Sequence, residues 1–343
     1  MTERNGMRYG VLGLIVLTLL IFLGLMVAIQ SPTTSEPTAP GATTAPALES
    51  LAALDGQAPA RRALDIQTWT TAEGAKVLFV AAPQLPMFDL RLTFAAGSSQ
   101  DGAVPGLAML TNAMLNEGVA GKDVGAIAEG FEGLGAHFGN GAYRDMAVAS
   151  LRSLSQRDLR EPALALFTEV LGAPSFPADS LARIQNQLLA GFEYQKQNPG
   201  KLAGIALFEA LYGSHPYAHS SDGNAQSIPA ITLEQLRAFH AKAYTASNAV
   251  IAVVGDLSRS EAEAISAQVS AALPKGPALA KTPQPDVPKA GRQHIEHPSK
   301  QTHLLLAQLG IDRREPDYAA LYIGNQILGG GGFGTRLMEE VRE

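Results

Sequence analysis

The chain has 343 residues, of which 46% are hydrophobic, and its formal net charge is −6 at pH 7. This composition is typical of a globular protein with a substantial core, and it lacks the basic excess that marks nucleic-acid binding. Cysteine is absent, which excludes disulfides, a thiol nucleophile, thiolate metal sites and a lipid-modified N-terminal cysteine, so the seven histidines are the main candidates for transition-metal ligands.

The N-terminal segment indicates a membrane anchor. Residues 10–29 are uncharged and apolar, and they would reach about 30 Å as a helix. Arg4 and Arg8 precede this run and no lysine or arginine follows until Arg61, so the positive-inside rule keeps the N-terminus in the cytoplasm and exports the rest. A cleaved signal peptide is the alternative, but the run is longer than a typical signal core. We expect residues 1–30 to anchor a single-pass membrane protein whose globular part is periplasmic or otherwise extracytoplasmic.

The next segment is expected to be a linker. Residues 31–50 are rich in Pro, Thr, Ala and Ser, and they offer too little apolar surface to fold. We expect an extended linker over 31–62 that holds the next domain away from the bilayer. A glycosylated stalk is an alternative on composition alone.

The first folded domain is expected over 63–274 and begins with strands. An alternating, β-branched pattern with a central turn predicts a hairpin over 63–83, and a further strand follows within 87–102. A helix is predicted over 105–118, because proline suits its first turn and Gly118 suits a left-handed cap.

The remaining elements of this domain complete an α+β pattern. Helices are predicted at 123–134, 158–172, 180–197, 200–213, 232–244 and 258–273, a strand pair at 136–154 and a buried strand at 248–257. This order predicts a two-layer domain in which helices cover one face of a mostly antiparallel sheet.

The C-terminal part is expected to begin a second domain. Residues 275–291 are rich in proline and have no periodicity, so they are predicted to link two domains. A strand-like stretch over 292–311 and a helix over 317–331 repeat the strand-then-helix opening of the first domain. We expect residues 292–343 to be the truncated start of a similar domain in a longer protein.

A family resemblance appears in several segments. PGLAMLTNAMLNEG at 105–118 resembles the zinc-binding helix of the insulinase/pitrilysin-type peptidases, whose pattern is roughly G-x-A-H-x-x-E-H-x-x-x-x-G. Further matches follow in order: AAGSSQDG before this helix, GAHFGNGAYRD after it, a long match over 215–258, and NQILGGGGFGTRLMEEVRE at the C-terminal end. The resemblance covers about residues 64–343.

The chain departs from the family where the chemistry is done. Met109 and Ala113 stand at the two histidine positions, and Asn112 stands at the glutamate position. The register of the family's third zinc ligand, a glutamate on a later helix, falls on Gly191, while Glu193 is about 200° further round that helix. Two imidazoles and a carboxylate are needed to hold Zn²⁺ and to deprotonate its water. We therefore predict no zinc site, no cofactor and no catalytic residue, with Met109 and Ala113 in core packing.

Two histidine clusters are candidates for a replacement metal site. In HIEH, a strand would turn His294 and Glu296 to one face and His297 to the other. In HPYAH, the proline and the resemblance indicate a loop that His215 and Tyr217 hold by hydrogen bonds. Neither is expected to bind a metal.

Other catalytic patterns are not found. No G-x-S-x-G nucleophile elbow is present, although spacing alone leaves Ser/His/Asp catalysis open, and GGGGFG lacks the lysine of a phosphate-binding loop.

The resemblance implies that a peptide-binding strand remains. In the family, the strand that matches GAHFGNGAYRD accepts an extended peptide at its edge. The matching residues here are Phe138, Gly139, Asn140, Gly141 and Ala142. Small side chains let a backbone approach but also weaken a strand, so an edge without a ligand is an equal alternative.

Members of the mitochondrial processing peptidase type work as pairs, in which one subunit carries zinc and the other a glycine-rich loop. The segment LGGGGFGT resembles that loop through Gly329, Gly330, Gly331, Gly332 and Gly334. The leading hypothesis is therefore a non-catalytic subunit that forms a heterodimer with an active zinc-containing homologue in peptide or protein processing. A stand-alone peptide-binding or scaffold protein is the alternative, and an active zinc peptidase comes third.

Overall fold

The structure is a computed structural model that describes residues 64–342. The predicted anchor at 1–30 and linker at 31–62 lie outside the described residues, so both stay predictions. Within 64–342, no helix combines the length and the apolar character needed to cross a membrane.

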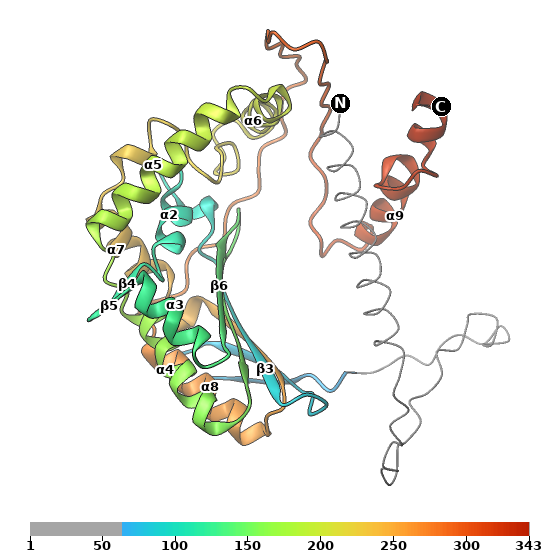
Figure 1. The fold of residues 1–343 in the computed structure, drawn as a ribbon. Helices are drawn as coiled ribbons and strands as arrows, with labels where there is room; N and C mark the ends of the chain where they lie inside the picture. The colour runs from blue at the N-terminus through green and yellow to red at the C-terminus, as the bar shows by residue number, and fades with distance from the viewer. Residues whose placement is uncertain (1–63, 343) are drawn as a thin grey trace, which may run out of the picture. The chain divides into compact units, whose positions relative to one another are not determined.

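Six strands form one sheet in the order β1-β2-β8-β3-β7-β6 (Figure 1). β2 and β8 run parallel, whereas every other neighbouring pair is antiparallel, which confirms the predicted mostly antiparallel sheet. The strands are β1 (Gln67–Thr70), β2 (Lys76–Ala81), β3 (Met87–Phe94), β6 (His137–Ala142), β7 (Ala147–Leu154) and β8 (Ala249–Gly255).

Helices occupy the sequence between and after these strands. They are α2 (Leu107–Ala113), α3 (Val124–Glu132), α4 (Arg157–Gly172), α5 (Ala178–Gln195), α6 (Pro199–Tyr212), α7 (Leu233–Ala243) and α8 (Arg259–Ala272). The predicted capping box at the start of α7 is present, because the Thr232 hydroxyl accepts from the Gln235 N–H while the Gln235 side chain accepts from the Thr232 N–H. A minor ladder pairs β4 (Gly118–Val119) with β5 (Lys122–Asp123).

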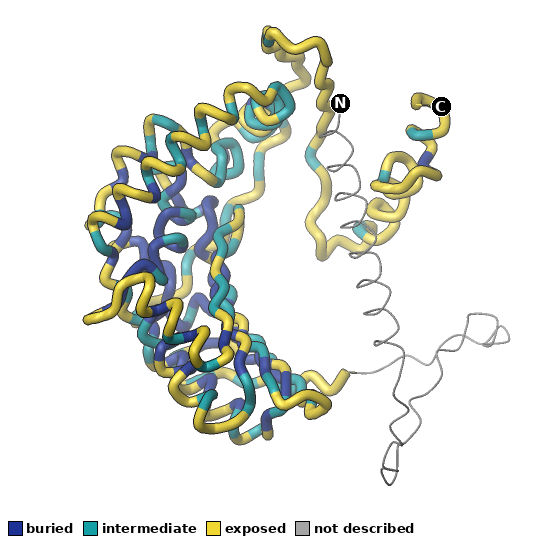
Figure 2. The backbone as a smooth tube through the Cα atoms, viewed as in Figure 1, coloured by how far each residue is buried: buried dark blue, intermediate teal, exposed yellow. Residues whose placement is uncertain are grey.

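The sheet has one buried face and one open face. Along β3, residues Phe88, Leu90, Leu92 and Phe94 are at most 1% exposed, while the residues between them are partly or fully exposed. β8 alternates in the same sense, and so does β7 from Ala149 to Leu154, after the buried residues Ala147 and Val148. We call the buried side the helix face, because α3, α4 and α8 cover it (Figures 1 and 2). The other side is the open face.

Two apolar clusters hold the domain together. The larger one joins the helix face of the sheet to α3, α4, α8 and part of α7. The smaller one joins α2, α5 and α7, and its fully buried members include Leu110, Met114 and Leu236. Burial of this apolar surface is the main source of stability.

The predicted helix over 105–118 is wrong at both ends. It spans only Leu107–Ala113, its N-cap is Gly106 with φ +92°, and Gly118 is a buried strand residue of β4 instead of a left-handed cap. A side chain at Gly118 would meet Ser175 Oγ at 2.7 Å, so this glycine allows close packing. The proline start signal lies two residues before the helix, and the glycine stop signal lies in β4, beyond the end of the helix.

The predicted strand over 292–311 is also wrong. These residues form no strand, and no strand of the described chain lies beside them to complete a ladder. Isolated extended backbone has no partners for its N–H and C=O groups, so apolar alternation alone does not make a sheet. The following helix is confirmed as α9 (Tyr318–Gly329), and it buries none of its residues (Figure 2).

The segment predicted as an interdomain linker is bound to the first domain over its first half. Gly276 O accepts from Ser247 Oγ at 2.6 Å, Leu279 N–H donates to Asn248 Oδ1 at 3.3 Å, and Pro283 O contacts His215 Nε2 at 2.8 Å. Leu279 also packs against the main core. Residues 276–283 are therefore held along the domain by hydrogen bonds, although they form no helix or strand.

Two glycine substitutions should have opposite effects on stability. A side chain at Gly255, where φ is +149°, would lie 2.4 Å from Met87 O, so Gly255→Ala should lower the free energy of unfolding by roughly 2 kcal/mol or more. Gly191 lies in α5 with open space around it, so Gly191→Ala should raise that free energy by up to about 1 kcal/mol. Urea unfolding of both variants measures the difference. Equal effects at the two sites would contradict this account.

Candidate functional site

The candidate site is built around α2. This helix carries Met109, Asn112 and Ala113, three of the four positions that match the family's zinc ligands and catalytic glutamate. The start of the helix is held by Asp101, whose carboxylate accepts hydrogen bonds from the Gly106 and Ala108 N–H groups, each at 2.7 Å. α2 then packs against β6, β7 and α7. The helix is thus fixed at its start and along its side, next to one edge of the sheet.

Asn112 points into the protein. It is 2% exposed, and its Nδ2 atom donates to Tyr244 Oη at 3.1 Å and to Val148 O at 3.3 Å. Burial raises the pKa of the fully buried Tyr244 hydroxyl, which is therefore neutral at physiological pH. The side chain in the glutamate position thus joins α2 to β7 and to the residue after α7.

The other three positions offer no ligand set. Met109 and Ala113 are half-buried, and Met109 packs against the smaller cluster, so their predicted place in the core is only partly right. Gly191 is exposed on α5, and a Cβ atom there would touch nothing within 4 Å. Glu193 is exposed and pairs with Lys196 at 2.7 Å. Neither position on α5 supplies a carboxylate to α2.

The histidine clusters behave as loop and surface groups. His294 and Glu296 are highly exposed and contact one another at 2.8 Å, while His297 Nε2 reaches Lys196 O at 3.3 Å. Within 64–342, no three His, Asp or Glu side chains are placed to hold a metal ion together. The His and Glu side chains of HIEH are therefore neighbours along the chain, but they do not converge on a common point.

β6 is an edge strand and is attached to α2. Asn140 Nδ2 donates to Asn112 O at 2.7 Å, and the Phe138 ring stacks on Phe131 at 5.6 Å between centroids. The five residues Phe138, Gly139, Asn140, Gly141 and Ala142 all lie on β6, as the sequence placed them. Their β7 neighbours occupy one side of the strand, and no other described strand occupies the second side.

The register of the hairpin identifies the outward backbone groups. Tyr143 N–H donates to Met146 O at 2.7 Å, which makes this a hydrogen-bonded pair. Antiparallel pairs alternate, so Gly141 and Gly139 face β7, whereas the N–H and C=O groups of Phe138, Asn140 and Ala142 face outward. This edge can accept a further strand.

A clamp of polar groups holds the β6–β7 turn, residues 143–146, to the HPYAH loop. Arg144 Nη1 donates to Tyr217 O at 2.6 Å and to His219 O at 3.1 Å, and its guanidinium lies 4.5 Å from the centroid of the Phe208 ring. Tyr217 Oη donates to Asp145 at 2.5 Å, and together with burial this acidic neighbour raises the Tyr217 pKa. The turn at the end of the open edge is therefore fixed in place.

His215 completes the clamp through both of its ring nitrogens. Its Nδ1 atom accepts from the Tyr217 N–H at 3.1 Å, so its Nε2 atom carries the proton and donates to Pro283 O. The prediction that His215 and Tyr217 hold this loop by hydrogen bonds is confirmed. The sequence analysis missed Arg144 and Asp101, although both stand in segments that matched the family, GAYRD and SSQDG.

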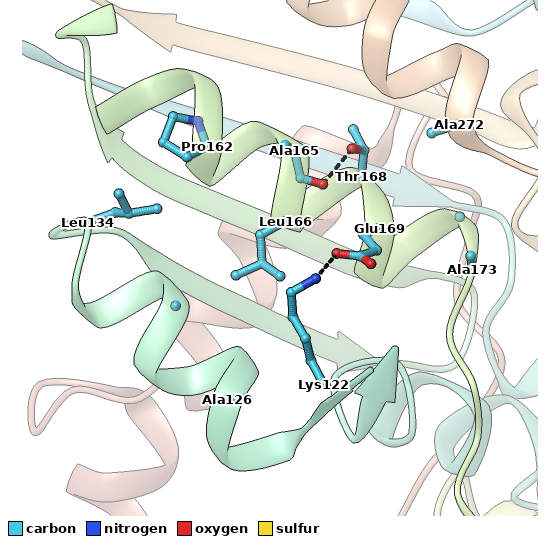
Figure 3. A pocket seen from close by; sticks show the side chains of 12 residues that line it. Lys122, Ala126, Leu134, Pro162, Ala165, Leu166, Thr168, Glu169, Ala173 and Ala272 are labelled. Carbon is cyan, nitrogen blue, oxygen red and sulfur yellow. Dashed lines mark hydrogen bonds and ion pairs between the residues drawn. The ribbon is translucent and has the colours of Figure 1, made fainter. Parts of the chain in front are cut away.

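A groove of about 560 Å³ lies elsewhere, between α3 and α4 (Figure 3). Its lining includes small or apolar residues such as Ala126, Ala165 and Leu166, and an ion pair joins Lys122 to Glu169 at 2.7 Å. It contains none of the predicted site residues, and its two ionisable side chains, Lys122 and Glu169, are paired with one another, so it is not the candidate site.

Asp101 should make stability depend on pH. Burial raises its pKa from 3.8 to about 7, against the opposing effect of its two N–H donors. Because the folded state then holds this proton more tightly than the unfolded chain does, stability should fall as pH rises from 3.8 to about 7. Asp101→Asn mimics the neutral form. The variant should match the parent at low pH and become the more stable of the two near pH 8, as measured by thermal unfolding.

The control for this prediction is Asp123→Asn, which removes an exposed cap of α3 that accepts from Ala126 N–H at 2.9 Å. It tests whether losing any capping carboxylate produces the same pH profile. An Asp101→Asn variant that is less stable than the parent at high pH would show that the fold favours the carboxylate, contrary to the prediction.

Comparison with known proteins adds the following findings. A sequence profile described as "Peptidase M16 inactive domain" matches residues 230–343. A crystal structure of a peptidase M16 inactive domain from Pseudomonas fluorescens shares 78% sequence identity and a TM-score of 0.80, covering 81% of this chain and 68% of that one.

Curated relatives are more distant. A protein of Helicobacter pylori called non-peptidase homolog YmxG is 28% identical over 75% of this chain, and an uncharacterized zinc protease of Mycobacterium leprae is 24% identical over 83%. The chain spans 60% and 64% of the lengths of these two relatives.

Proposed function

The chain belongs to the peptidase M16 family, and on this premise we propose that it is a zinc-less member which binds peptides without cutting them. The resemblance to insulinase/pitrilysin-type peptidases in the sequence is thereby confirmed at the level of the family. The related proteins carry both kinds of description, non-peptidase homolog and zinc protease, so the residues of this chain must decide between them.

The observation that carries the proposal is the position of Asn112. A general base must reach a metal-bound water, but the Asn112 amide is buried and donates to Tyr244 and Val148. An amide also has no basic lone pair for this purpose. Met109, Ala113 and Gly191 offer no imidazole or carboxylate that could bind Zn²⁺. Restoring activity would need several changes at once, including one that breaks the Asn112–Tyr244 contact.

The proposed binding element is the outward edge of β6. An extended peptide would add as a strand beside Phe138, Asn140 and Ala142, with main-chain hydrogen bonds supplying most of the affinity. The Arg144 clamp and the Asn140–Asn112 bond support this idea, because they hold the edge in one position before a peptide arrives.

The assembly that we propose has a partner. An exported, membrane-anchored chain would pair with a zinc-containing homologue, and the glycine-rich segment at 329–334 would lie against the substrate of the pair. Gly329, Gly331, Gly332 and Gly334 are exposed, which supports this use, since exposed glycines leave the backbone free to adapt. The alternative is a stand-alone peptide-binding scaffold, which differs only in having no peptidase attached.

Blocking the β6 edge should abolish peptide binding. Ala142→Pro removes an outward N–H and adds a ring without removing a bond to β7. A short labelled peptide that alternates glutamine and threonine is expected to bind the parent chain and to lose at least tenfold in affinity for this variant, as measured by fluorescence anisotropy.

The matched control is Thr68→Pro on β1, the other edge of the sheet. Thr71 N–H donates to Ala75 O, so Thr68 is also an outward position by the same alternation. Both variants should unfold at similar temperatures, and only Ala142→Pro should lose binding. Equal loss in both, or in neither, would argue against the β6 edge as the binding element.

The partner can be tested by affinity purification of the full-length chain from a membrane extract. If the pairing is correct, a zinc-containing homologue should co-purify, with chelator-sensitive peptidase activity that follows the complex and is absent from the isolated chain. Recovery of the chain without a homologue or zinc would favour the scaffold, and zinc-dependent activity in the isolated chain would overturn both.

A further inference from the structure

The open face of the sheet carries an unbalanced positive charge. Asp89 on β3 and Arg152 on β7 neutralise one another through two contacts, Nε to Oδ1 at 2.7 Å and Nη2 to Oδ2 at 3.0 Å. Lys76 and Arg91 are exposed on the same face, and neither forms an ion pair within residues 64–342. The whole protein has a net charge of −6, so this face is opposite in sign to the protein as a whole.

Arg91 is aligned with the open edge of β6. In the register of the sheet, Arg91 stands beside Ser150 on β7, and Ser150 stands beside Gly139 on β6. All three lie on the open face, because their neighbours Leu90, Leu151 and Phe138 point toward the helices. We call this set the Arg91 row.

The Arg91 row has no bulky side chain between the arginine and the edge. Ser150 is small and its hydroxyl donates to Gly139 O at 3.2 Å, while Gly139 has no side chain. Along β6, the space over Gly139 and Gly141 lies between the side chains of His137 and Tyr143. A Cβ atom on Gly139 would lie 4.0 Å from His137 Nε2, and one on Gly141 would lie 3.7 Å from the Tyr143 hydroxyl. An incoming side chain could therefore lie over Gly139.

The distance between Arg91 on β3 and a peptide strand added to β6 suits a long cationic side chain and a long anionic one. A peptide strand added to β6 would lie three strand spacings from β3, which is about 14 Å. An arginine and a glutamate that extend toward one another over a glycine can bridge this gap, whereas a shorter or blocked pair cannot. The adjacent row, Asp89–Arg152–His137, already has its charges paired and its edge position filled.

We propose that Arg91 is a specificity-determining residue that selects peptides with an acidic side chain opposite Gly139. This inference rests on the proposed peptide docking at β6 and names the class of peptide that the site takes. Acidic side chains on the open face would gain an ion pair, while basic ones would be repelled by the same guanidinium.

Two labelled peptides test this inference with the full-length chain. One alternates glutamate and threonine, and the other alternates glutamine and threonine, so that in a strand all the variable side chains share one face. The parent chain should bind the glutamate peptide roughly fivefold more tightly at low salt, the scale of an exposed ion pair. This preference should shrink as salt is added, because salt screens exposed charges.

Variants separate this inference from the function on which it rests. Arg91→Ala should abolish the preference while keeping affinity for the glutamine peptide, and Arg91→Glu should reverse it. Lys242→Glu makes the same charge change at an exposed position on α7, away from the sheet, and should leave the preference unchanged.

The outcomes are distinct. If Arg91→Ala keeps the preference, or if the parent binds both peptides equally, the role of Arg91 is wrong and peptide docking stands. Failure of the parent chain to bind either peptide would overturn the docking at β6 and, with it, this inference.

Discussion

The structure depends on covering only one face of its sheet. The buried residues of β3, β7 and β8 alternate with exposed ones, and the helices supply apolar partners on a single side. Because the apolar side chains of the sheet are buried against that one helical layer, the other face can carry charges and the outer edge of β6 needs no further strand. Each feature proposed to bind a peptide lies on the part of the sheet that packing leaves free.

Asn112, which stands at the family's glutamate position, contributes to the stability of the fold. In a peptidase the position of Asn112 would serve a reacting water, but here its amide spans α2, β7 and the residue that follows α7. Its backbone oxygen also accepts from Asn140 on the edge strand. Buried polar groups require partners, so this network fixes the position of α2 beside the edge. α2 therefore supports the edge strand β6 through the Asn112–Asn140 hydrogen bond.

The loop that follows α6 connects three otherwise separate parts. Through Arg144 and Tyr217 it holds the β6–β7 turn, and through His215 it holds the segment at 276–283. His219 Nδ1 lies 3.9 Å from Oδ2 of Asp101, the residue that holds the start of α2. Hydrogen bonds therefore connect the β6–β7 turn at the edge of the sheet, through this loop, to residues 276–283.

The sequence by itself determined most of the elements, the family and the missing zinc ligands, because local periodicity, caps and residue identity are properties of short segments. Helices such as α7, with its capping box, and the hairpin of β6 and β7 could be predicted for this reason. Only the tertiary structure decided that α2 ends at Ala113, that 292–311 form no strand, and that Asn112 meets Tyr244 across 132 positions of sequence. It also decided that Arg91, Ser150 and Gly139 share one row, because register between distant strands is set by packing and ladder hydrogen bonds, which no local pattern records.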